Sequence, residues 1–277
     1  MNKFIKQLQD SDKRIVIPIM THPGIEAIGK KVIDAVTDGN VHYQAIRNVT
    51  ETYDTTACTV IMDLTVEAEA FGCTINMPEH EVPCVTGRLV YDEETVNNLQ
   101  VPSLSAGRMP EYLKANRLAV KNIKDKPVLS GCIGPFSLAG RLYDMSEIMV
   151  GIYIEPDVIK TLLDKCTAYI TAYCRELKAI GATGVIMAEP AAGLLSNEDC
   201  QEYSTVYVRQ IVEAVQDEDF TVILHNCGNR GQCTQAMIDS GAAALHFGNA
   251  VDMVETLEQC PSDLIVMGNI DPVGILK

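Results

Sequence analysis

Short apolar runs rich in β-branched residues alternate with longer amphipathic stretches along the whole sequence. This alternation is typical of parallel strands joined by crossover helices. Because the runs are hydrophobic nearly throughout, we expect both faces of each strand to be buried. Seven strands are predicted, at residues 15–20, 57–64, 127–133, 184–188, 221–225, 242–247 and 264–268.

The length and hydrophobic content fit one large core. A chain of 277 residues that is 47% hydrophobic can form one domain over residues 1–277. The pattern predicts an α/β fold of the (β/α)8 TIM-barrel class. A closed barrel has eight strands, so either one strand escapes the count or the chain lacks its last helix and strand. A long excursion at residues 72–126 is expected either to line the barrel mouth or to act as a structural cap.

Two helices have clear start and stop signals. The stretch from Asp157 to Ile180 carries its apolar residues on one face, and Gly181 follows as a stop. Ser196 is the expected N-cap of a second helix that runs to Val215.

The charge of the chain disfavours two classes of binding partner. With 37 acidic and 22 basic residues, the formal charge of -15 disfavours nucleic acid and anionic membranes. No signal peptide is evident, and no stretch approaches the ~18 apolar residues of a membrane span, so a cytoplasmic protein is predicted.

The ten cysteines are expected to be reduced. Four of them fall in apolar stripes and are expected in the core, namely Cys58, Cys132, Cys166 and Cys174.

The sharpest local signal is His225-Asn226-Cys227-Gly228, where a buried strand runs into a turn. Side chains alternate along a strand, so His225 and Cys227 are expected to point the same way, at the end where barrel enzymes place their sites. An imidazole and a thiolate are donors that Zn²⁺ prefers. A structural histidine beside a buried cysteine is the alternative.

Four segments together resemble the uroporphyrinogen decarboxylase superfamily over nearly the whole length. They are Met62-Asp63 to Gly72, Gly131 to Gly140 with Gly134-Pro135-Phe136, the His225-Asn226-Cys227-Gly228 strand end, and Gly268-Asn269-Ile270-Asp271-Pro272. Within that superfamily, His-x-Cys-Gly resembles the branch of methylcobamide:thiol (coenzyme M type) methyltransferases.

The resemblance implies a zinc-dependent methyltransferase. It implies zinc ligation by His225 and Cys227, with a third ligand on a strand beyond residue 277; Cys233 and Cys260 are the nearby substitutes. It also implies a methylcobamide (corrinoid) carried by a separate corrinoid protein, and a small-molecule thiol acceptor. The acceptor, the methyl donor and any homo-oligomer stay open.

Polar groups at other strand ends are candidates for the same site. Glu189 and Asp63 are the candidate catalytic residues, with capping or backbone binding as their alternatives. His42 and His80 are expected in surface loops. Residues expected to face substrate are His22, Gly134, Pro135, Phe136, His246 and Asn269, of which Asn269 has turn formation as its alternative.

Two rival functions follow from the same resemblance. The first is a metal-free decarboxylase of a tetrapyrrole or another carboxylate, which would need basic residues at the mouth. The stretch 17–24 has no arginine, and the remaining candidates are Arg88, Arg108 and Arg141. The second is a non-catalytic corrinoid- or tetrapyrrole-binding protein.

Overall fold

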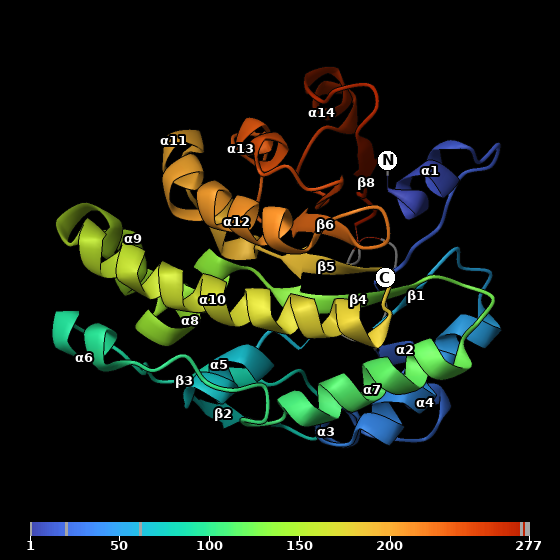
Figure 1. Ribbon diagram of the computed structural model, residues 1–277, viewed down its shortest axis with the longest axis horizontal. Coiled ribbons are helices and arrows are strands. Elements are labelled where there is room, and N and C mark those ends of the chain that lie inside the picture. Colours follow the sequence, from blue (N-terminus) through green and yellow to red (C-terminus); the bar gives the residue numbers. More distant parts are fainter. Residues whose placement is uncertain (1, 20–21, 61–62, 272–273, 275–277) are drawn as a thin grey trace.

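Six parallel strands form one curled, incomplete barrel in the computed structural model (Figure 1). The structure describes residues 2–19, 22–60, 63–271 and 274. Met20, Thr21, Met62 and Pro272, which belong to predicted segments, lie outside this part. The sheet has the order β1-β4-β5-β6-β7-β8. Its strands are β1 (Cys58–Thr59), β4 (Val128–Ile133), β5 (Gly184–Ala188), β6 (Thr221–Asn226), β7 (Ala244–Phe247) and β8 (Ile265–Met267).

Helices follow the strands and cover the outer face of the sheet. The α/β barrel class is thus confirmed, with β2 (Thr74–Asn76) and β3 (Cys84–Thr86) forming a separate antiparallel hairpin. Within the described residues, no helix combines the length and apolarity that crossing a bilayer requires. The helical elements are α1 (Lys3–Gln9), α2 (His22–Ala27), α3 (Val32–Thr37), α4 (Gly39–Thr52), α5 (Val66–Phe71), α6 (Glu93–Asn98), α7 (Met109–Asn122), α8 (Pro135–Tyr143), α9 (Met145–Ile154), α10 (Pro156–Ile180), η1 (Pro190–Leu194), α11 (Asn197–Cys200), η2 (Gln201–Thr205), α12 (Val206–Val215), α13 (Thr234–Asp239) and α14 (Met253–Gln259).

The two helices expected from sequence form where their signals lie. Helix α10 ends at Gly181, whose φ of 97° is the left-handed conformation that a residue with a β-carbon rarely adopts. Ser196 caps α11 by accepting a hydrogen bond from the main-chain N–H of Asp199 at 3.0 Å. The predicted second helix contains a π-helical turn, η2, before it continues as α12 to Val215.

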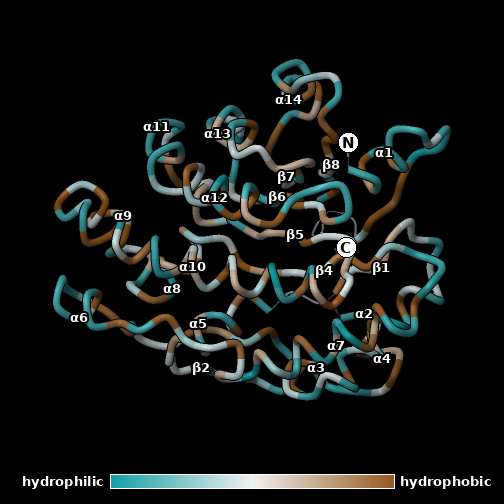
Figure 2. The backbone as a smooth tube through the Cα atoms, in the orientation of Figure 1, coloured by the Kyte–Doolittle hydropathy of each residue, from teal (hydrophilic) through white to brown (hydrophobic). Residues whose placement is uncertain are grey.

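Side chains alternate between the two faces of the sheet, as the period of a strand requires. On the inner face, Leu129, Ile186, Ile223 and Ala244 come from four successive strands and form one cluster with Phe4, Ile5 and Leu8 of α1. On the outer face, the intervening residues pack under α8, α10 and α12 together with the predicted core cysteines Cys132, Cys166 and Cys174. Figure 2 shows apolar colour on the strands and also on the helices that pack against them.

Helix α1 covers the end of the barrel where the strands begin. Lys3 donates its main-chain N–H to the carbonyl of Glu218 at 2.8 Å, just before β6. The side-chain amide of Gln9 donates to the carbonyl of Asp263 at 2.8 Å, just before β8. The opposite end, where the strands finish, is therefore the one free to carry a site.

Residues 15–19, which belong to the first predicted strand, do not form a regular strand. Residues 15–19 run beside β1, since Thr56 donates its N–H to the carbonyl of Val16 at 2.9 Å, but they form no regular ladder. Pro18 lacks the N–H that a central strand would donate. The period of two persists, because Ile15, Ile17 and Ile19 all pack against the inner cluster.

The excursion at residues 72–126 contains the β2–β3 hairpin, α6 and α7. Leu89 and Val90 both donate main-chain N–H groups to the carbonyl of Leu142 at the end of α8. Lys165 of α10 donates to three carbonyls at the end of α6, the closest being that of Val96 at 2.6 Å. The first part of the excursion therefore packs beside the helices that follow β4. Helix α7 then leads the chain back to β4.

Candidate functional site

Two histidines meet at the end of the inner face. His225 is the penultimate residue of β6 and His246 is the penultimate residue of β7, and the two are direct partners in the parallel register. Their positions continue the inward rows of Ile223 and Ala244. Nδ1 of His225 lies 2.6 Å from Nδ1 of His246, and the rings stand edge to face with centroids 4.6 Å apart.

Burial favours the neutral form of both rings. Burial, followed by the proximity of His246, lowers the pKa of His225 to about 4. Burial likewise lowers the pKa of His246. A neutral imidazole has a lone pair on one nitrogen and can therefore serve as a metal ligand or a base.

Cys227 follows directly, one residue beyond the end of β6. Strand β6 ends at Asn226, whose side-chain oxygen accepts the N–H groups of Gly228 and Asn229 at 3.1 and 3.0 Å. The thiol thus lies in a turn, where strand alternation no longer sets its direction. Cys227 is exposed as a whole residue, whereas desolvation of its sulfur raises the pKa of the thiol. A β-carbon on Gly248 would come within 2.8 Å of the Cys227 Cα, so this turn packs tightly against the one after β7.

Glu189 directly follows β5 and is completely enclosed, with 1% of its surface exposed. Its main-chain N–H donates to the carbonyl of His225 at 2.8 Å. Its Oε1 accepts the N–H groups of Phe136 and Ser137 at 2.7 and 3.1 Å, whereas Oε2 has no partner among the described residues. Burial is the main reason that the pKa of Glu189 rises to about 8.

The turn after β4 is shaped around this carboxyl group. A β-carbon on Gly134 would overlap Oε2 of Glu189, so glycine is needed there. Pro135 starts α8, and the Phe136 ring is fully buried in the core. Of these three predicted substrate-binding residues, Phe136 therefore reaches the site only through its main chain.

A second buried carboxyl group, Glu67 of α5, was not anticipated. Its Oε1 accepts the N–H of Ile133 at 3.0 Å, and its Oε2 has no partner among the residues the structure describes. Burial raises the pKa of Glu67 to about 7. Nothing in the sequence around Glu67 distinguishes it from the exposed glutamates of an amphipathic helix.

Asp63 sits in a buried network in which both of its oxygens are engaged. One oxygen accepts from the N–H and hydroxyl of Thr65, and the other from Arg108 at 2.5 Å and Tyr112 at 3.1 Å. Arg108 also pairs with Glu69 at 2.6 Å. This arrangement supports the structural alternative for Asp63 over a role at substrate.

The remaining predicted residues are spread around the same end of the barrel. His22 begins α2, after the segment that runs beside β1. The side-chain amide of Asn269 donates to the carbonyl of Val251 at 2.7 Å, which ties the turn after β8 to the loop after β7. This contact fits the turn-forming alternative for Asn269.

Neither substitute cysteine joins His225 and Cys227. The Cys233 thiol is buried and donates to the carbonyl of Leu195 at 3.3 Å, and Cys260 precedes β8 at the opposite end of the barrel. Within the described residues, no cluster of three His, Cys, Asp or Glu side chains is placed to bind a metal. Imidazole and thiol match zinc in chemistry, so the residues present fit the ion as a pair of donors rather than as a full set.

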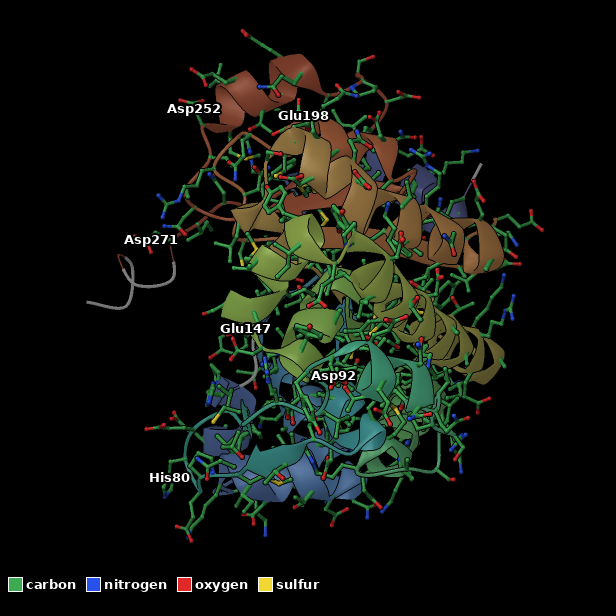
Figure 3. The ribbon with its side chains drawn as sticks, turned by 90° about the vertical axis from the view of Figure 1, so that its left-hand side faces the viewer. His80, Asp92, Glu147, Glu198, Asp252 and Asp271 are labelled. Carbon is green, nitrogen blue, oxygen red and sulfur yellow. The ribbon has the colours of Figure 1, made fainter. Side chains whose placement is uncertain are left out.

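Acidic side chains stand exposed on this end of the molecule, which Figure 3 views directly. They come from the starts of α6, α9, α11 and α14 and from the segment after β8. The labelled ones are Asp92, Glu147, Glu198, Asp252 and Asp271.

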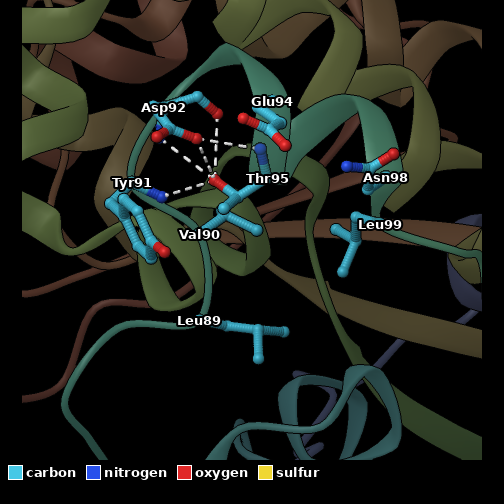
Figure 4. A pocket seen from close by; sticks show the side chains of 8 residues that line it. All are labelled: Leu89, Val90, Tyr91, Asp92, Glu94, Thr95, Asn98 and Leu99. Carbon is cyan, nitrogen blue, oxygen red and sulfur yellow. Dashed lines mark hydrogen bonds between the residues drawn. The ribbon is translucent and has the colours of Figure 1, made fainter.

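A nearby pocket of about 370 Å³ has a structural explanation (Figure 4). Its polar wall is the N-terminal cap of α6, where Asp92 accepts from the N–H and the hydroxyl of Thr95 at 2.8 and 2.7 Å. Its apolar wall includes Leu89, Val90 and Leu99. Because Asp92 and Thr95 are already paired within the cap, and His225 and Cys227 do not line the pocket, it is not assigned to the His225 site.

Comparison with known proteins gives a consistent set of relatives. Residues 9–277 match the family model described as uroporphyrinogen decarboxylase (URO-D). The methylcobamide:CoM methyltransferase MtbA of Methanosarcina mazei is 32% identical over 224 residues, which are 79% of this chain and 66% of that protein. The uroporphyrinogen decarboxylase of Legionella pneumophila is 26% identical over 232 residues, 81% of this chain and 65% of that protein. The chain thus spans about two thirds of the length of these curated relatives.

A solved structure confirms the fold. The methyltransferase from Methanosarcina mazei superposes with a TM-score of 0.88 at 22% sequence identity, covering 99% of this chain and 85% of that one.

Proposed function

The chain belongs to the uroporphyrinogen decarboxylase family, and on that premise we propose that it is a methyltransferase that moves a methyl group between a methyl-corrinoid and a thiol acceptor. The observation that carries the proposal is the placement of two potential zinc donors, His225 and Cys227, at the strand ends that face away from α1. A corrinoid protein that presents the methyl group and a cytoplasmic location are parts of the same proposal.

The relatives favour this activity over decarboxylation. Identity is 32% to a protein named as a methylcobamide:CoM methyltransferase and 26% to a protein named as a uroporphyrinogen decarboxylase. His225 and Cys227 would hold zinc. The further donors would come from groups other than the side chains described around this pair. Bound zinc supplies the positive charge that keeps an acceptor thiol deprotonated at neutral pH.

The chain's own residues prepare this site. The neutral His225 ring offers a lone pair, and the sheet register and the Glu189 N–H fix its main chain. A methyl-corrinoid presented at this end of the barrel would supply the methyl group, the acceptor thiolate would be the nucleophile that takes it, and the corrinoid would keep the electron pair of the bond to the methyl group. The thiol proton would be released to solvent water before this step.

Two of the three arginines that a decarboxylase could use are already paired. Arg108 is paired with Asp63 and Glu69, and Arg88 lies 3.5 Å from Glu147. Arg141 is half-buried, and the charge of Glu67 opposes the lowering of its pKa by burial. Together with the exposed acidic side chains at this end, these pairings disfavour a substrate with many carboxylates.

Metal analysis of the purified protein tests the proposal. We expect zinc in the protein, and its loss from both His225→Ala and Cys227→Ala. His80→Ala and Cys84→Ala are matched controls, because both side chains are exposed and come from the β2–β3 region. Zinc retained in both site variants would contradict the assignment.

The absorption spectrum of methylcobalamin, recorded as thiols are added, measures the reaction itself. Thiol-dependent demethylation that the His225→Ala variant lacks is the expected result. Cobalamin binding without demethylation would favour the non-catalytic alternative, and carboxylate loss from uroporphyrinogen would favour the decarboxylase.

A further inference from the structure

The contact between His225 and His246 involves a single shared proton. Their Nδ1 atoms are 2.6 Å apart, which is within hydrogen-bond distance. Two N–H groups would collide across this gap and two lone pairs would repel each other, so one ring donates and the other accepts. The donor ring then has its lone pair on Nε2, and the acceptor ring has its second proton there.

The contact is built into the sheet. His225 and His246 are paired in the register of β6 and β7, and His246 is paired on its other side with Met267 of β8. The His225 carbonyl accepts the N–H of Glu189, the residue that follows β5. Main-chain hydrogen bonds across four strands thus set the spacing of the two rings, and the contact does not depend on a surface loop.

We propose that His246 is a positioning residue, which accepts the Nδ1 proton of His225 and leaves Nε2 of His225 with the lone pair that binds zinc. The inference rests on the proposed function, because that function requires His225 to be a ligand. Metal-binding histidines generally donate their second ring N–H to a fixed acceptor, which sets the tautomer and the ring orientation. An imidazole acceptor does so without adding a negative charge to the site.

Two substitutions separate the acceptor from the bulk of the ring. His246→Asn retains a side-chain oxygen near the position of Nδ1, whereas His246→Leu has a similar size and no acceptor. The ¹⁵N chemical shifts of the ring nitrogens report the tautomer of His225 in the metal-free protein. Zinc affinity is measured separately, by competition with a chromophoric chelator.

We expect His225 to be protonated on Nδ1 in the unsubstituted protein and in His246→Asn, and to lose this preference in His246→Leu. Zinc affinity is expected to fall about 10–100-fold in His246→Leu and to be largely restored in His246→Asn. A purely structural role of His246 would not make the tautomer and the affinity follow the acceptor.

The proposal is overturned if His225 carries its proton on Nε2 in the unsubstituted protein, or if His246→Leu binds zinc as tightly as that protein does. If His246→Leu does not fold, the tautomers of His225 in the unsubstituted protein and in His246→Asn still test the proposal. A protein with the expected tautomer that binds no zinc would instead contradict the proposed function, while the hydrogen bond from His225 to His246 would stand.

Discussion

Gly134 and Glu189 occupy one space, in which a β-carbon on the glycine would overlap Oε2 of the carboxyl group. Gly134 is the N-cap of α8, and the next two main-chain N–H groups of that helix, those of Phe136 and Ser137, bind the other oxygen of Glu189. The absence of a side chain at residue 134 thus lets the end of β5 reach the start of α8.

Gly134→Ala is expected to destabilise the protein by about 1–3 kcal/mol, the usual range for overpacking a filled interior. Urea unfolding measures the loss. In the double variant with Glu189→Ala the overlap is absent, so the combined loss should be smaller than the sum of the two single losses. Strict additivity would show that the two residues do not share this space.

The buried carboxyl of Glu189 makes stability depend on pH. Its pKa is about 8 in the folded protein against an ordinary value of 4.5, so the folded state binds this proton more tightly than the unfolded state does. The free energy of unfolding should therefore fall as pH rises from about 4.5 to about 8. Glu189→Gln, which cannot ionise, should remove its share of this fall.

Glu213→Gln is the control for this pH dependence, because Glu213 lies exposed on α12 and its substitution should leave the slope unchanged. Glu67, whose pKa is raised to about 7, contributes a further fall of the same sign. Stability that rises with pH in the unsubstituted protein, with no difference in Glu189→Gln, would contradict the assignment.

Arg108→Met is expected to cost about 3–5 kcal/mol, because it leaves the buried Asp63 carboxylate without its cation. Arg117→Met is a matched control, since Arg117 pairs with Glu176 at 2.6 Å on the surface and such pairs contribute about 1 kcal/mol or less. Chemical denaturation compares the two variants. Equal losses would show that burial of the Asp63 network does not determine its contribution.

The sequence predicted the barrel because the strands that carry it are uniformly apolar. Strands β4 to β7 and helix α10 lie within or close to the predicted ranges, and Gly181 is the predicted helix stop. The segment 15–19 has the same apolar composition, yet it forms no ladder because Pro18 lacks an N–H. Composition therefore located the segments but not their hydrogen bonding.

The site was predicted in part, since its main features depend on register between strands. His225 was predicted at a strand end, but its contact with His246 requires knowing that β6 and β7 pair at these two residues. A weak signal was present, because each histidine is the penultimate residue of its strand. The alternation expected to align Cys227 with His225 stops at Asn226.

Buried polar residues were the hardest to predict. His42 was expected at the surface, yet it is 1% exposed on α4, with its ring edge-on to Tyr112 at 4.9 Å. Its burial, like that of Glu67, follows from helices that are distant in sequence and cover it. The residue pattern of one helix does not predict which distant helices will cover it.

The position of α1 has a consequence for synthesis. Lys3 bonds to Asp219 across 216 positions, and Gln9 bonds to Asp263 across 254. Helix α1 is thus made long before these partners, and Phe4, Ile5 and Leu8 cannot be fully covered until the later strands of their cluster have been made. Docking of α1 therefore has to wait for the segments around Glu218 and Asp263.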